Sequence, residues 1–225
     1  MVEDALNAAL DEVRHAKVSF EIASSLVGKD LGPGPLPPSS IEFKQDMKAL
    51  AVAVAREGCV DETLSALAAA AECELIDSEL ENKEAWGNKY SGVTDEVLVW
   101  IRSELRTIAF DEGNHSALAW RTLDWVCNVD AEACEAAKQG VLNESALTSA
   151  FRHRFSDFEE HPELLERMLA AWTQIYSRSR VLNSEDAGVA CIVGNAQEVF
   201  DRDSIEGRSL LSTLVENISH RSQRE

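Results

Sequence analysis

The stretch LVWIRSELRTIAFDEGNHSALAWRTLDWVC, residues 98–127, decides the fold because its apolar residues recur at every third or fourth position. This spacing places them on one face of a helix. The face consists of Leu98, Ile101, Leu105, Ile108, Glu112, His115, Ala119, Thr122 and Val126. A carboxylate and an imidazole within a buried stripe are costly unless another group pairs with them. Glu112 and His115 are therefore candidates for a role beyond packing.

A second Glu-x-x-His lies in residues 3–28, which are predicted to form a helix that ends at Gly28. One stripe of this helix places two polar residues among small and apolar ones: Ala5, Ala8, Glu12, His15, Ser19, Ile22 and Leu26. The other stripe is apolar: Leu6, Leu10, Val13 and Phe20. Glu-x-x-His on the inner faces of two helices, with a Glu from each of two others, is how di-iron carboxylate bundles hold metal.

A third long helix is predicted over residues 41–76, after a loop over residues 29–40 that is rich in proline and glycine. Glu57 falls within its stripe of large apolar residues: Phe43, Met47, Leu50, Val54 and Leu64. Glu62 falls within a stripe of small residues: Ala51, Ala55, Cys59, Ala66 and Ala69. The periodicity favours Glu57 as the inward carboxylate, with Glu62 as the alternative.

Chain distances place these side chains at one depth if the three helices run up, down and up. His15 lies 13 residues before its helix ends, and Glu57 lies about 14 residues into its own, so both are roughly 20 Å from their common turn. Glu57 lies 19 residues before the end of its helix, and Glu112 lies 18 residues after Thr94. Two iron ions, or manganese, need carboxylates that bridge and imidazoles that complete the coordination. The sequence therefore predicts a two-metal site.

Four blocks of the sequence resemble a group of mostly bacterial ferritin-like proteins. They are Asp11-Glu12-Val13-Arg14-His15-Ala16, Gly32-Pro33-Gly34-Pro35-Leu36-Pro37, residues 56–63 (REGCVDET) and residues 108–121 (IAFDEGNHSALAWR). The resemblance covers residues 4–127 and implies a ferritin-like antiparallel helical bundle with a di-iron centre. It implies Glu12, His15, Glu57, Glu112 and His115 as metal ligands, with Glu62 as an alternate or supporting group. It implies no particular substrate.

The chain departs from this group at its first helix. Relatives carry a helix before the first Glu-x-x-His, with a Glu that completes the site, whereas eleven residues precede Glu12 here. We therefore expect a bundle with three core helices and an open face. A downstream helix (163–180 or 196–219) or a second copy of the chain could cover that face, and Glu198 or Glu216 could supply the missing oxygen. Residues 1–128 are expected to form the bundle, and residues 129–225 an accessory helical region.

Composition narrows the classes of partner. The formal net charge of −19 disfavours nucleic acid and anionic membranes as partners. The sequence has no apolar run of the ~18 residues that a membrane span needs, and its acidic start does not resemble a signal peptide. Five cysteines without framework spacing predict reduced thiols and a cytoplasmic location.

Two functions follow from these observations. The first is a metal-binding protein whose di-iron or manganese centre carries out oxidase, oxygenase or peroxide-consuming chemistry. The second is a helical assembly or interaction module, without catalysis, in which the metal site is degenerate. The pair of Glu-x-x-His motifs favours the first function, and the expected open face favours the second.

Overall fold

The computed structural model describes residues 1–35, 46–81, 90, 92–177 and 210–221. These residues form helices and turns with no strand among them, so the all-α prediction is confirmed. The helices are α1 (Val2–Val27), α2 (Met47–Ala53), the π-helix η1 (Val54–Glu62), α3 (Thr63–Glu81), α4 (Asp95–Val129), α5 (Ala131–Gly140), α6 (Glu144–Arg154), the 3₁₀ turn η2 (Ser156–Phe158), α7 (Pro162–Ser177) and α8 (Leu210–Arg221).

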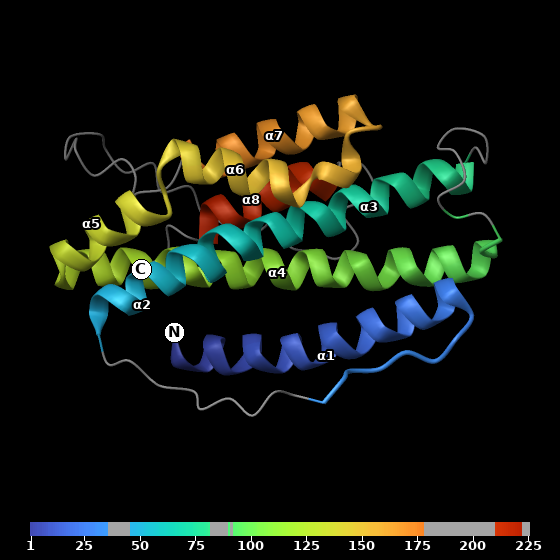
Figure 1. Cartoon of the computed structure of the whole chain (residues 1–225), viewed down its shortest axis with the longest axis horizontal. Helices are drawn as coiled ribbons and strands as arrows, with labels where there is room; N and C mark the ends of the chain where they lie inside the picture. The colour runs from blue at the N-terminus through green and yellow to red at the C-terminus, as the bar shows by residue number, and fades with distance from the viewer. Residues whose placement is uncertain (36–45, 82–89, 91, 178–209, 222–225) are drawn as a thin grey trace.

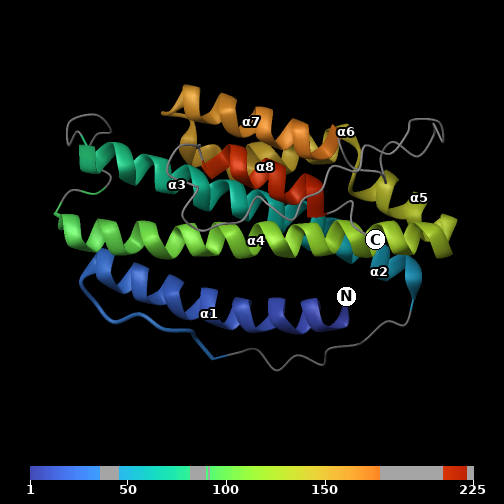
Figure 2. The ribbon, with the colours of Figure 1, turned by 180° about the vertical axis from the view of Figure 1, so that it is seen from behind.

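Helix α4 is the axis of the molecule. It contains 35 residues and runs the length of the structure, with α1 on one side and the continuous rod α2–η1–α3 on the other (Figure 1). The view from behind shows α8 lying over α3 and α4, with α7 beyond it (Figure 2). Among the described elements, α1 packs chiefly on α4, whereas α3 packs on α4, α7 and α8.

The direction of the third predicted helix differs from the expectation. Both α1 and the α2–η1–α3 rod run antiparallel to α4, so they are parallel to each other and the up-down-up order is wrong (Figure 1). The 19 residues between α1 and α2 connect opposite ends of the bundle. At ~3.3 Å per extended residue they can span the ~39 Å of a 26-residue helix. A long crossover of this kind replaces the connection at one end of the bundle that an up-down-up order requires.

Capping residues mark the ends of several helices, as is usual for the residue types found there. Gly28 ends α1 in the left-handed region at φ 62°, where a residue without Cβ is favoured. The side chain of Thr94 accepts a hydrogen bond from the Val97 amide at the start of α4. Asp130 and Asn143 cap α5 and α6 in the same way.

Small residues bring the α2–η1–α3 rod close to α4. Ala51, Ala55 and Cys59 are fully buried, whereas the large Leu50 is 41 % exposed. A Cβ added to Gly58 would lie 2.3 Å from the Cβ of Ala119, so this approach requires glycine. The stripe of small residues is therefore the more deeply buried one, whereas Leu50 and Glu57 on the stripe of large residues are exposed.

The accessory helices share an apolar core with the bundle. Aromatic rings form a chain of contacts across it: Trp120 and Tyr176 lie 5.3 Å apart at their centroids, and Tyr176 and Trp172 lie 4.3 Å apart. Phe151 of α6 continues this chain from Trp172. Only residues 210–219 of the predicted helix 196–219 fall within the described chain, where they belong to α8.

Two findings bear on the predicted compartment. Cys127 and Cys134 form a disulfide between α4 and α5, so the prediction that all five cysteines are reduced is wrong for this pair. They are separated by only seven residues, and the turn between α4 and α5 brings them together. Cys59 and Cys73 are free and buried.

Within the described part of the chain, no helix is both long and apolar enough to cross a membrane.

Candidate metal centre

The two Glu-x-x-His motifs face each other across the seam between α1 and α4. The Nδ1 atom of His115 lies 3.1 Å from Oε1 of Glu12, and Nδ1 of His15 lies 3.2 Å from Oε1 of Glu112. The two rings are 5.9 Å apart at their centroids. Each residue of the first motif has its counterpart 100 positions later in the second, and the two helices that carry the motifs are antiparallel. The arrangement therefore has an approximate twofold symmetry.

An aspartate before each glutamate completes the symmetry. Nε2 of His15 lies 3.2 Å from Oδ2 of Asp111, and Nε2 of His115 lies 3.3 Å from Oδ2 of Asp11. A carboxylate at Nε2 accepts that N–H and leaves the Nδ1 lone pair for a metal. Arg14 reinforces one half, since its Nη2 lies 2.5 Å from Oδ2 of Asp111. Each histidine thus presents Nδ1 to the space between the helices.

Glu62 joins the centre from the end of the π-helix. Ligand atoms of Glu12, Glu62, Glu112 and His115 all lie within 4.8 Å of one another, a grouping that could hold a metal ion. His15 touches two members of this cluster, at 3.2 Å from Glu112 and 3.5 Å from Glu12. The structure therefore brings five of the six sequence-predicted residues together.

The sixth predicted residue, Glu57, is exposed and lies outside the cluster, so the expectation that it faces inward is wrong. The cause is that the stripe of small residues, to which Glu62 belongs, is the buried one: Ala51, Ala55 and Cys59 are fully buried. Glu57 lies on the other stripe, where Leu50 is exposed as well. The nine residues from Val54 to Glu62 form a π-helix, and Glu62 at its end points to the centre.

Without a cation, the burial of these carboxylates and imidazoles costs free energy. His15, Glu112 and His115 are all less than 9 % exposed, and the buried Nδ1 of His15 and Oε2 of Glu112 have no hydrogen-bond partner. Burial is the main reason that the pKa of Glu112 is raised to about 10. A hydrogen bond with Glu62 and the charges of Glu62, Glu12 and Asp111 act in the same direction. A cation would satisfy both orphaned atoms and remove this repulsion.

A buried hydrogen-bond network supports the centre from behind. The hydroxyls of Thr63 and Ser116, each next to a member of the cluster, lie 2.6 Å apart. The Thr63 hydroxyl donates to the Cys59 carbonyl at 2.7 Å, and the Tyr176 hydroxyl reaches the same oxygen at 3.3 Å. These hydrogen bonds were not predicted from the sequence. Its only local signal is a hydroxyl residue directly after Glu62 and directly after His115.

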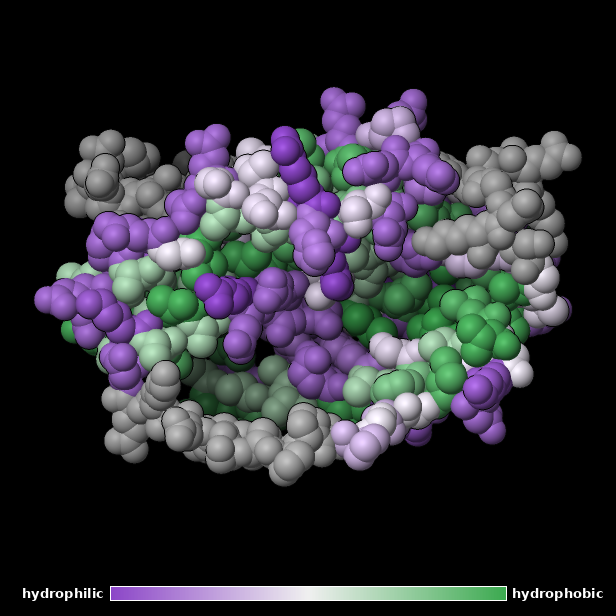
Figure 3. All heavy atoms as spheres, viewed as in Figure 1, coloured by the Kyte–Doolittle hydropathy of each residue, from purple (hydrophilic) through white to green (hydrophobic). Residues whose placement is uncertain are grey.

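One side of the centre is open. The side chain of Glu12 is 51 % exposed, in contrast to 10 % for its counterpart Glu112. The second stripe of α1 also faces outward, with Leu6, Leu10 and Val13 each at least 64 % exposed. In the view of Figure 3, hydrophilic residues gather across the middle of the molecule. Among the described residues, α1 therefore has an inward stripe against α4 and an uncovered apolar stripe.

The two residues considered as further oxygen donors do not enlarge the cluster. Glu216 lies on α8 and is not a member of the cluster, and Glu198 lies outside the described residues.

Comparison with protein-family models, with curated proteins and with solved structures yields no match. The geometry of the centre is thus the basis for any functional conclusion, and it establishes a helical protein with a carboxylate and histidine group that could bind metal.

Proposed function

We propose that this chain is a ferritin-like metal-binding protein that holds a pair of iron or manganese ions between α1, η1 and α4. The observation that carries the proposal is the twofold arrangement of the two Glu-x-x-His motifs, in which each Nδ1 approaches glutamates of both helices. The long crossover before α2 also agrees with ferritin-like connectivity. The donor set of carboxylates and imidazoles suits iron and manganese.

Each residue has a distinct role in this proposal. Glu12 and Glu112 each lie beside a histidine of the opposite helix, and these two carboxylates together with His15 and His115 would hold the ions. Glu62 would add the third carboxylate from η1. Asp11 and Asp111 hold the imidazoles in the tautomer that presents Nδ1. Bound iron or manganese would supply electron transfer to dioxygen or peroxide, which these side chains cannot perform alone.

Metal titration of the purified full-length chain tests this function. Metal-free protein is titrated anaerobically with Fe(II) or Mn(II), and the bound metal is counted by elemental analysis after desalting. We expect about two ions per chain, as a di-metal carboxylate site requires. Less than about a tenth of an ion per chain with either metal would overturn the proposal.

A matched pair of glutamates sharpens this test. Glu62→Gln removes an inward carboxylate and should weaken metal binding by more than the about 10- to 100-fold typical of supporting residues. Glu57→Gln makes the same chemical change five residues earlier, on an exposed side chain, and should leave binding unchanged. Equal affinities for the two variants would place the metal elsewhere.

The uncovered stripe of α1 favours the second function, an assembly or interaction module. Leu6, Leu10 and Val13 form an exposed apolar row, which in soluble proteins often marks a binding surface. If this were the sole function, self-association or partner binding would persist unchanged in Glu112→Gln, and the titration would find no stoichiometric metal. Finding both metal and association would assign the two functions to opposite faces of α1.

A further inference from the structure

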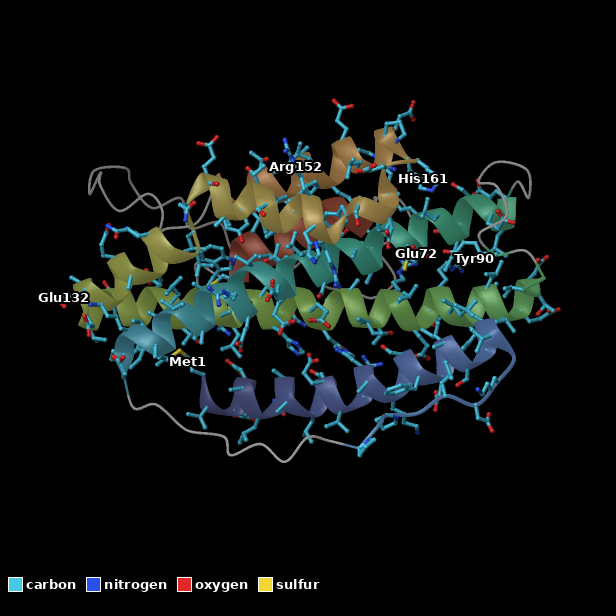
Figure 4. All side chains as sticks on the ribbon, viewed as in Figure 1. Met1, Glu72, Tyr90, Glu132, Arg152 and His161 are labelled. Atoms are coloured by element: carbon cyan, nitrogen blue, oxygen red, sulfur yellow. A yellow bond between two sulfur atoms is a disulfide. The ribbon has the colours of Figure 1, made fainter. Side chains whose placement is uncertain are left out.

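The outer face of α1 carries an apolar stripe that runs the whole length of the helix. It consists of residues three or four positions apart: Val2, Leu6, Ala9, Val13, Ala16, Phe20, Ala23 and Val27. Six of these residues are exposed, and Phe20 and Ala23 are half-buried. Side chains of α1 extend away from α4 as well as toward it, with Met1 at one end of the helix (Figure 4). Within the described chain, this stripe has no covering element.

Helix α1 has little packing within the described chain. Two of its 26 residues, His15 and Val18, are buried, whereas α4 buries 13 of its 35 residues. A helix in a folded protein is held mainly by the burial of its apolar face rather than by its intrinsic propensity. An uncovered apolar stripe that extends over seven turns therefore marks a binding surface.

The side chains of the stripe are complementary in size to those of a second copy of the same stripe. Large residues recur every seven positions, and alanines recur every seven positions between them. In an antiparallel pair, each large residue of the middle turns faces an alanine of the other copy: Leu6 faces Ala23, Val13 faces Ala16 and Phe20 faces Ala9. Large side chains opposite small ones interdigitate, and the seven-residue period keeps both stripes in contact along their length.

A parallel pair lacks this fit, because every residue would face its own counterpart. Phe20 would face Phe20 and Ala9 would face Ala9, so some layers would be overpacked and others would contain a cavity. A parallel pair would allow an exposed ion pair between Glu12 and Lys17, which stabilises less than these packing defects destabilise. The sizes of the side chains therefore favour the antiparallel order.

The charges beside the stripe are also compatible with an antiparallel pair. Each flanking charge would lie next to an uncharged residue of the other copy: Glu3 next to Ser24, Glu12 next to Ser19, and Lys17 next to Leu10. Like charges that face each other cost free energy at an interface. Their absence from these flanks matters in a chain whose formal net charge is −19.

We propose that two copies of this chain associate through the outer stripes of their α1 helices, antiparallel and about a twofold axis. The inference goes beyond the proposed metal site, which lies on the opposite face of α1, and it names a second copy as the partner of the exposed row. One helix face ~39 Å long and ~10 Å wide covers about 400 Å², which is half of a standard interface. We therefore expect a reversible dimer with a Kd on the order of 10 µM, and a monomer in dilute solution.

Sedimentation equilibrium of the metal-free full chain, from about 1 to about 200 µM, tests for the dimer. The average mass should rise from 24.7 kDa toward twice that value as the concentration increases. Because the copies repel each other through their net charge, the dimer should be stronger at high salt. Glu112→Gln should dimerise as the wild type does, whatever its effect on metal binding, so the two proposals fail independently. A wild-type chain that stays a monomer throughout overturns the proposal and assigns the stripe to a different partner.

A larger side chain at a small position distinguishes this dimer from general hydrophobic association. Ala16→Leu adds an apolar side chain opposite Val13 of the second copy and should weaken dimerisation about tenfold or more by overpacking. General hydrophobic association would instead become stronger. Ala170→Leu makes the same change at an exposed position of α7 and should leave the Kd unchanged. Circular dichroism checks that both variants are folded, and a Kd for Ala16→Leu equal to that of the wild type would overturn the proposal.

Cross-linking measures the alignment of the two helices directly. Leu6→Cys and Ala23→Cys are mixed and treated with a short bismaleimide, while the free native thiols, Cys59 and Cys73, are buried. Antiparallel pairing places the two new thiols opposite each other, so the mixture should give a cross-linked dimer. In either variant alone the new thiols lie about 25 Å apart, at ~1.5 Å per residue, and should not be linked. Cross-linking in each variant alone, without any increase in the mixture, would show a parallel pair and overturn the proposal.

Discussion

The two sides of α4 differ in what their residues contribute. To the shared apolar core, α4 contributes Leu123, which is fully buried, and Trp120, whose ring lies 5.3 Å from that of Tyr176 in α7. Toward α1 it presents Glu112 and His115, which cost free energy to bury. The apolar side can hold the fold together, and the seam with α1 can therefore tolerate a charged cluster. The comparison predicts that stability and metal binding respond to different substitutions.

The largest effect should come from removing a side chain on the apolar side. Leu123→Ala leaves a cavity and should lower the free energy of unfolding by about 2–5 kcal/mol. Leu6→Ala makes the same change on the outer face of α1, where the side chain is 64 % exposed, and should change it by less than about 0.5 kcal/mol. Urea unfolding of both variants measures the difference. Similar losses would contradict the division between the two sides.

A smaller effect is expected where the π-helix meets α4. Gly58→Ala would be favourable by helix propensity, yet its Cβ would lie 2.3 Å from that of Ala119. We expect destabilisation by about 1–3 kcal/mol, together with weaker metal binding because Glu62 is carried on the same segment. Adding Ala119→Gly should restore most of the loss in a double-mutant cycle. Additive losses would show that this contact does not set the helix spacing.

The charged seam should make stability depend on pH in the metal-free protein. The pKa of Glu112 rises from 4.5 to about 10 on folding, so its contribution is fully present below about pH 4.5 and is lost as the pH rises toward 10. Metal-free wild type should therefore lose more stability than Glu112→Gln between about pH 5 and pH 9. Urea midpoints at three pH values measure this, and parallel curves for the two proteins would refute it.

The smallest effect on folding is expected on the outer face of α1. Leu10→Lys replaces a side chain that is 70 % exposed and should change the free energy of unfolding by less than about 0.5 kcal/mol. If a second copy of the chain covers this face, the same variant should abolish self-association of the full chain in analytical ultracentrifugation. A wild-type chain that sediments as a monomer at high concentration would exclude the homo-oligomer predicted from the sequence.

Much of the helical layout could be predicted because it depends on local residue patterns. The 3.6-residue period located α1 and α4 to within a few residues, and glycine and threonine at their ends mark where they stop and start. The same period placed both Glu-x-x-His motifs on inward faces. It failed at Glu57, because the period allows two stripes on the α2–η1–α3 rod and does not say which one is buried; the stripe of small residues, which contains Glu62, is the buried one.

Residue patterns by themselves determined that the chain is helical, that His15, Glu112 and His115 are buried, and that a second apolar stripe lies on α1. Only the tertiary structure decided that α2–α3 runs parallel to α1, that Glu62 takes the place expected for Glu57, and that Asp11 and Asp111 support histidines of the opposite helix. The reason is physical. Periodicity records which face of a helix is buried, whereas direction, depth and cross-helix partners depend on contacts between residues up to about a hundred positions apart.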